Sequence, residues 1–224
     1  LRTYQWLRYG VPVQIAAGQA HETVHLIDWA CPEKNGFALA EEVTLKGGHE
    51  RRPDIVLYLN GLAIAVIELK RSSVDVADGV RQLITNQEEI FNKGFFSTVQ
   101  FVLAGSDSQG LRYGTTGTPE QFFVEWKDEA PAEAGATPVA GALLDRPLAQ
   151  LCNKARLLDL LRYFVLFDAG HKKVPRQHQF FGVKAAQLRV AKQEGGVIWH
   201  TQGSGKSILM VLLAKWLLEH DAEA

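Results

Sequence analysis

The chain has 224 residues, of which 46% are hydrophobic and 22% charged, and its formal net charge is −1. These proportions are typical of a folded globular protein with room for one large domain, or for one domain and part of another. The near-zero net charge excludes a globally basic protein, so any contact with nucleic acid must come from a local group of side chains.

The two cysteines and the N-terminal residues indicate the cellular compartment. Cys31 and Cys152 lie far apart and fit no metal-binding spacing, so we expect reduced thiols in a cytosolic protein. No apolar run reaches the roughly 18 residues of a membrane span. The opening LRTYQWLRYG has neither a signal-peptide core nor a start methionine, and we expect the sequence to be part of a longer chain.

Apolar runs predict strands in the first third of the chain. Two are predicted at 24–29 (VHLIDW) and 37–45 (FALAEEVTL). Residues 54–70 (DIVLYLNGLAIAVIELK) contain two further apolar runs, joined by Asn60 and Gly61. An Asn-Gly pair between apolar runs is the signature of a β-hairpin turn.

Helical periodicity becomes the dominant pattern after the hairpin. One helix is predicted from Asp78 to Gly94, and a strand follows at 97–105 (STVQFVLAG). Residues 127–147 are rich in alanine, proline, glycine and acid, which indicates an exposed connection. Residues 148–167 are strongly apolar and predict a buried helix, and a second helix is expected after a basic loop.

Residues 196–210 (GVIWHTQGSGKSILM) predict an apolar strand, a glycine loop and a helix that begins at Lys206. Bound triphosphate needs close backbone N–H groups, a cation and a hydroxyl for Mg²⁺. The loop supplies them through the following residues: Gly203, Ser204, Gly205, Lys206 and Ser207. The long phosphate-loop pattern expects glycine at His200, so the match is to a shorter, helicase-like form. Hydrolysis needs further groups that the 17 residues after Ser207 do not supply, so we expect no ATPase activity from this sequence alone.

Residues 21–25 (HETVH) match a zinc-peptidase motif. On a helix, His21 and His25 would share one face with Glu22 as the base. The neighbouring β-branched residues instead predict a strand, in which positions 21 and 25 lie about 13 Å apart, too far for one zinc ion. We therefore favour surface or edge-strand histidines. A zinc peptidase would instead contain stoichiometric zinc in the purified chain.

Residues 52–72 (RPDIVLYLNGLAIAVIELKRS) have the pattern of a metal-dependent nuclease. Asp54 and Glu68 can hold Mg²⁺ together with the Leu69 carbonyl, while Lys70 orients the attacking water. The alternative is a hairpin with a charged rim. Against it, Glu68 interrupts a run so apolar that its strand should be buried, and buried carboxylates are costly unless they are paired or bound to metal.

The hairpin register tests this nuclease interpretation. A simple two-residue loop at Asn60 and Gly61 would set Asp54 opposite Ile67, so that Asp54 and Glu68 would point to opposite faces of the sheet. One additional residue sets Asp54 opposite Glu68. We therefore predict an odd-length loop or a β-bulge between Asp54 and Glu68, with both carboxylates and the Lys70 amine converging.

A family resemblance rests on four stretches: LIDWACPEKNGFALAEEVTL, RPDIVLYLNGLAIAVIELKRS, LRYGTTGTPEQFFVEWK and GGVIWHTQGSGKSILM. Together they resemble the restriction (R, motor) subunit of type I restriction-modification enzymes over nearly the whole chain. The resemblance implies an α/β fold: a PD-(D/E)xK nuclease domain at 1–167, with a mixed sheet, flanking helices and a C-terminal helix. It further implies a linker and the start of a RecA-like, superfamily-2 motor domain at 168–224.

The resemblance also assigns roles to residues. Asp54, Glu68 and Lys70 take the nuclease roles, and the 203–207 loop binds ATP, with Gln179 as a candidate to read adenine. The family's Q-x-x-x-Y motif corresponds to Gln82 and Asn86, which are candidate DNA-backbone contacts although asparagine replaces tyrosine.

The implied function is ATP-dependent translocation of double-stranded DNA followed by Mg²⁺-dependent cleavage. The implied partners are modification (methyltransferase) and specificity subunits, in a bacterial or archaeal cytoplasm. The alternative is a DNA helicase or translocase whose nuclease-like domain is only structural.

Overall fold

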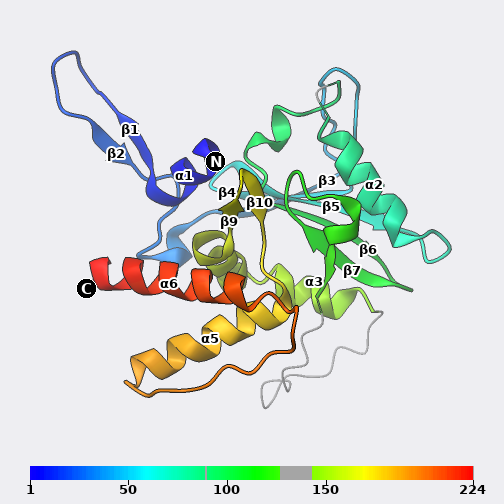
Figure 1. The fold of residues 1–224 in the computed structure, drawn as a ribbon. Coiled ribbons are helices and arrows are strands. Elements are labelled where there is room, and N and C mark those ends of the chain that lie inside the picture. The colour runs from blue at the N-terminus through cyan, green and yellow to red at the C-terminus, as the bar shows by residue number, and fades with distance from the viewer. Residues whose placement is uncertain (89, 127–142, 224) are drawn as a thin grey trace.

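The computed structural model describes residues 1–88, 90–126 and 143–223, and it contains a six-stranded mixed sheet flanked by helices (Figure 1). In spatial order the strands are β3 (Phe37–Glu41), β4 (Ile55–Leu59), β5 (Leu62–Lys70), β6 (Phe101–Ser106), β7 (Gly110–Gly114) and β8 (Val124–Glu125). The central strands β5 and β6 are parallel, and the other neighbours are antiparallel. The expectation of a mixed α/β sheet is confirmed.

Hydrophobic side chains on both faces of the sheet hold the helices in place. Val66 on β5 and Val102 on β6 pack with α2 (Val76–Asn86), which crosses one face. Ile67 and Leu103 point the other way, into the larger core. That core includes α4 (Lys154–Asp159), the π-helical turn Leu160–Phe164 and α5 (Gln177–Ala191). Because β5 is buried on both faces, any charged side chain near its end must find partners within the protein.

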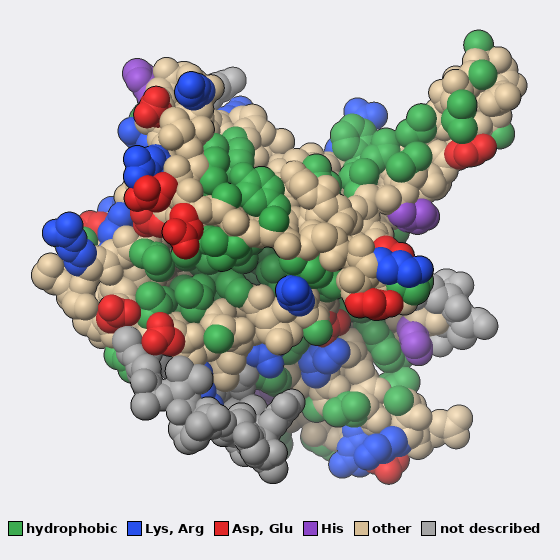
Figure 2. Space-filling view, turned by 180° about the vertical axis from the view of Figure 1, so that it is seen from behind, with side chains coloured by type: hydrophobic (Ala, Val, Ile, Leu, Met, Phe, Trp, Pro, Cys, Tyr) green, Lys and Arg blue, Asp and Glu red, His purple; other side chains and the backbone are tan. Residues whose placement is uncertain are grey.

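The remaining elements lie around this core. They are α1 (Arg2–Tyr9), β1 (Val11–Val13), β2 (Glu22–Val24), α3 (Asp145–Leu151), β9 (Leu166–Asp168), β10 (His171–Lys173) and α6 (Lys206–Glu223), with 3₁₀ turns at Pro32–Lys34, Phe95–Ser97 and Glu120–Phe122. The β1–β2 hairpin projects from the body, and hydrophobic side chains remain visible along it in Figure 2. Ile15 at its tip is 67% exposed.

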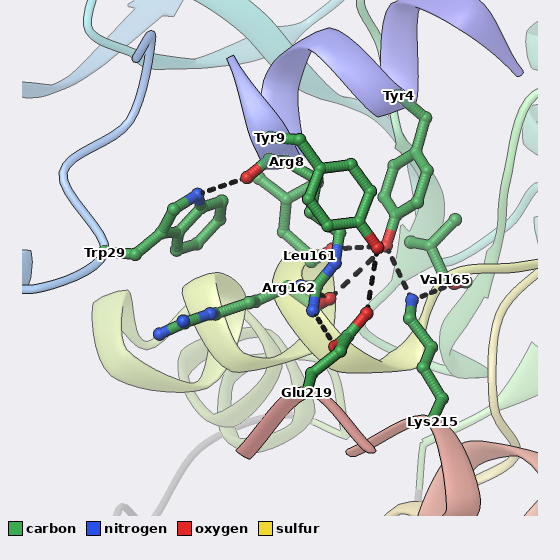
Figure 3. Close-up of polar contacts among 9 residues, drawn as sticks. All are labelled: Tyr4, Arg8, Tyr9, Trp29, Leu161, Arg162, Val165, Lys215 and Glu219. Carbon is green, nitrogen blue, oxygen red and sulfur yellow. Dashed lines mark hydrogen bonds and ion pairs between the residues drawn. The ribbon is translucent and has the colours of Figure 1, made fainter. Parts of the chain in front are cut away.

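A polar network joins α1 to α6, more than 200 positions away in the sequence (Figure 3). The Arg8 guanidinium, which is 5% exposed, forms an ion pair with Glu219, and Tyr9 donates to the same carboxylate at 2.8 Å. The Lys215 ammonium donates to the Tyr4 hydroxyl at 3.2 Å. These contacts fix α6, the helix that follows the glycine loop, against the N-terminal helix.

Two strand predictions need correction. The strand expected at 24–29 ends at Val24, because Val24 pairs with Val11, the first residue of its partner strand β1. The chain then turns where the Asp28 carboxylate accepts the N–H groups of Ala30 and Cys31. The strand expected at 37–45 ends at Glu41, because Glu42 has a φ of 53°, outside the extended region. The strand expected at 97–105 is confirmed from Phe101 onward.

Two helix predictions have the wrong bounds. The helix expected from Asp78 to Gly94 runs from Val76 to Asn86 and leaves Ile90 59% exposed. Its N-terminus is capped by Asp75, whose carboxylate accepts the N–H of Ala77 at 2.9 Å.

The helix expected at 148–167 is instead α3, α4 and the π-helical turn, and its last two residues, Leu166 and Phe167, belong to β9. It is interrupted where Asn153 accepts the N–H groups of Ala155 and Arg156 and starts a new helix. Residues 127–142 of the expected connection lie outside the described residues.

Candidate active site

The β4–β5 hairpin contains the predicted bulge. Asn60 and Gly61 have φ values of 49° and 81° and form a two-residue turn. Tyr58 pairs with Ala63, but Leu57 pairs with Ala65, so Ile64 is an extra residue on β5. The expectation of a bulge is confirmed, although the loop itself has two residues rather than three.

The bulge decides which side chains face each other. Ile55 pairs with Ile67, so the preceding Asp54 comes opposite Glu68. Glu68 shares a face with Val66, the face covered by α2. Lys70 lies two positions further on the same face, where its side chain packs beside Gly79 of α2. The structure therefore brings Asp54, Glu68 and Lys70 together, as predicted.

Hydrogen bonds hold the Glu68 carboxyl, which is 1% exposed. Gln82 Nε2 donates to Glu68 Oε2 at 2.9 Å, and Asn86 Nδ2 lies 3.5 Å from Glu68 Oε1. The Lys70 ammonium donates to Gln82 Oε1 at 2.6 Å and lies 3.9 Å from Glu68 Oε2. Asp54 Oδ2 accepts the backbone N–H of Leu69 at 2.6 Å. The side chains expected to contact DNA, Gln82 and Asn86, are thus turned toward Glu68.

The electrostatics of the site favour a cation. Burial, together with the nearby Asp54 carboxylate, raises the pKa of Glu68 from 4.5 to about 8, and the Lys70 ammonium partly opposes both effects. Two carboxylates that face each other repel, so the pair is most stable when a proton or a metal ion lies between them.

The residues present fit Mg²⁺, which needs only one or two protein carboxylates and keeps several waters. Among the described residues no group of three His, Cys, Asp or Glu side chains could hold a metal, so Asp54 and Glu68 would be the only carboxylate ligands there. Asn86 Oδ1 is a further buried oxygen with no hydrogen-bond partner in the described structure. The predicted role of the Leu69 carbonyl remains a prediction.

The glycine loop leads into α6 at Lys206, as predicted, with φ values of 77° at Gly203 and 81° at Gly205. The preceding strand is not formed. Val197 and Trp199 are each 89% exposed, and no described strand pairs with residues 196–200. A strand needs a neighbour to satisfy its backbone groups, and the apolar pattern alone does not supply one.

Gln179 lies against this loop and is only 2% exposed. Its Nε2 donates to the carbonyls of Ser204 and Gly205 at 3.2 and 3.1 Å. His178, which the sequence did not single out, places Nε2 2.7 Å from the Ser204 carbonyl. Both side chains brace the loop. The Lys206 ammonium donates to the carbonyls of residues 200 and 201 within the same loop.

The HETVH stretch does not form a zinc site. Glu22 begins β2, so His21 and His25 flank an extended strand instead of sharing a helical face. The prediction that this segment forms a strand is confirmed.

Two known protein families match parts of the chain. Residues 1–122 match the family described as type I restriction enzyme R protein N terminus, and residues 178–224 match the SWI2/SNF2 ATPase family. The chain belongs to the type I restriction enzyme R protein N-terminal family. The resemblance to a type I restriction R subunit is confirmed.

Curated relatives agree with this assignment. The type I restriction enzyme HindI endonuclease subunit of Haemophilus influenzae is 33% identical over 96% of this chain and 22% of its own length. The putative MjaVIIIP endonuclease subunit of Methanocaldococcus jannaschii is 30% identical over 88% of this chain and 20% of its own length. The chain therefore spans about a fifth of the length of these relatives. None of the helices in the described ranges is long and apolar enough to cross a membrane.

Proposed function

We propose that the end of the β4–β5 hairpin is the Mg²⁺-dependent centre of a PD-(D/E)xK nuclease that cleaves double-stranded DNA. The register carries this proposal: the bulge at Ile64 sets Asp54 opposite the buried Glu68, with Lys70 on the same face. The alternative, a hairpin that only has a charged rim, does not explain why Asp54 faces the buried Glu68. Two facing carboxylates destabilise the folded state unless a cation lies between them.

Each side chain has a role that follows from its contacts. Asp54, Glu68 and the Leu69 carbonyl would hold Mg²⁺, which when bound supplies polarisation of the phosphodiester and an acidified water. Lys70 holds a proton on Nζ next to this position and orients the attacking water. Gln82 holds the Lys70 ammonium and the Glu68 carboxyl at once, and so fixes their spacing.

The second part of the proposal concerns the longer protein. Residues 1–167 would form the nuclease domain, and residues 168–224 the linker and first part of a RecA-like motor. The 203–207 loop would bind ATP, with Gln179 bracing it. The whole protein would translocate and cleave double-stranded DNA in complex with modification and specificity subunits. The similarity of residues 178–224 to SWI2/SNF2 ATPases supports this part.

A DNA translocase with a non-catalytic nuclease-like domain is the second candidate. The replacement of the motif tyrosine by Asn86 favours it, because that departure lies within the centre itself. The two candidates separate in the full-length assembly. We expect Asp54→Ala and Lys70→Ala to abolish DNA cleavage while ATPase activity remains. Cleavage that persists in both variants would leave only the translocase.

A further inference from the structure

A cavity of about 230 Å³ lies beside the carboxylates. Its walls are Arg51, which precedes Asp54 by three residues, and Gln82, Thr85 and Asn86 of α2. Gln82 and Asn86 contact Glu68 with their amide groups. The cavity therefore shares two of its walls with the proposed nuclease centre.

Arg51 is held in place within this wall. Its backbone exchanges hydrogen bonds with Leu45 at 2.7 and 3.2 Å, and its guanidinium lies 4.0 Å from the centre of the Phe91 ring. In the described part of the chain no carboxylate lies within ion-pair distance of Arg51, whereas its neighbour Arg52 is paired with Glu42. A positioned guanidinium with its donors available is a typical receptor for a phosphate group.

The wall formed by α2 contains a buried oxygen without a hydrogen-bond partner in the described ranges. Asn86 is 1% exposed, and its Oδ1 has no hydrogen-bond partner among the described residues. Buried polar atoms are rarely left without a partner, but this oxygen has almost no accessible surface, so an occupant of the cavity would reach it only after a shift of the Asn86 side chain. The volume is sufficient for a phosphate group.

We propose that this cavity binds a phosphate group of the DNA substrate strand, with Arg51 as the residue that neutralises it. The inference rests on the proposed function, because a phosphate of the substrate strand reaches this cavity only if the strand binds at the neighbouring centre. Arg51 supplies positive charge at the wall of this cavity, next to the residues that contact Glu68.

The test compares Arg51→Gln with Arg52→Gln, since the two arginines are adjacent in sequence. The probe is a short duplex oligonucleotide in Ca²⁺ buffer, and affinity is measured over a range of salt concentrations. We expect Arg51→Gln to weaken binding about 10-fold and to reduce the slope of log affinity against log salt by about one, because one phosphate contact is lost. Arg52→Gln should stay within about twofold of the parent chain, because Arg52 is exposed and lies outside the cavity.

Equal affinities and slopes for the two variants, or no binding by the parent chain, would overturn the proposal. Thermal stabilisation by Mg²⁺ serves as the folding control and should be unchanged in Arg51→Gln. Failure of the nuclease assignment has a different signature: Asp54→Asn would leave Mg²⁺ stabilisation intact, whatever the result for Arg51.

Discussion

Replacing Glu68 by glutamine should make the metal-free protein more stable at alkaline pH. The folded pKa of Glu68, about 8, lies above the ordinary value of 4.5, so the folded state binds this proton more tightly than the unfolded state does. The contribution of Glu68 to the free energy of unfolding is therefore fully present below pH 4.5 and is lost as the pH rises to about 8. Glutamine is neutral at every pH and avoids this loss.

The magnitude follows from the size of the shift. At about 1.4 kcal/mol per pKa unit, the Glu68→Gln variant should gain up to about 4 kcal/mol on the parent chain between pH 5 and pH 9. For a chain of this length that corresponds to roughly 10 °C in melting temperature. The two proteins should differ by less than about 1 kcal/mol at pH 5, because Glu68 is then protonated in the folded state.

The assay is thermal or urea unfolding in EDTA from pH 5 to pH 9, with the exposed Glu33→Gln as the control for loss of one carboxylate. Saturating Mg²⁺ should then stabilise the parent chain at pH 8, by about 2.7 kcal/mol at one hundred times Kd, and should not stabilise Glu68→Gln. If the free energies of unfolding of the parent chain and Glu68→Gln had the same pH dependence in EDTA, the claim that burial and Asp54 raise the pKa of Glu68 would be refuted.

Three further predictions concern the glycine loop and its helix. Gly205→Ala should loosen the loop, because Gly205 has a φ of 81° and an added Cβ would lie 2.4 Å from Gln179 Nε2. Backbone hydrogen exchange at residues 203–206 should then become faster. The control is Gly117→Ala, which has the same φ but open space around the added Cβ and should leave exchange at 203–206 unchanged. Arg8→Met should lower the free energy of unfolding by about 3 kcal/mol, because Glu219 loses its buried partner. Adding Glu219→Gln should recover part of this loss in urea unfolding. A double variant that recovered none of it would contradict a stabilising role of the ion pair. The 224-residue chain should hydrolyse no ATP, and measured turnover that disappeared in Lys206→Ala would contradict this.

The sequence sufficed to predict which side of the hairpin carries Glu68 and Lys70, because short-range rules control it. Alternation along the strand places Glu68 and Lys70 on one face, and the Asn60-Gly61 pair predicts the turn that joins the two strands. The bulge could be inferred because without it Asp54 and Glu68 could not meet. Its position at Ile64, within β5 rather than in the loop, depends on packing that no local pattern encodes.

The errors arose where side chains or distant segments override local preference. β2 ends at Val24, where its partner β1 begins, and Asn153 satisfies backbone N–H groups and so starts a new helix within an apolar run. The strand expected at 196–200 lacks a described neighbour. The bracing of the glycine loop by His178 and Gln179 joins positions about 25 apart in the sequence and leaves no periodic signal.

The most direct test of the central claim is a calorimetric titration of Mg²⁺ or Mn²⁺ into this chain. We expect one ion bound per chain through Asp54 and Glu68, and we expect Asp54→Asn and Glu68→Gln each to abolish this binding while Glu33→Gln preserves it. Binding of equal affinity in the two centre variants and the parent chain, or no binding by the parent chain at all, would contradict the assignment of these carboxylates as a metal centre.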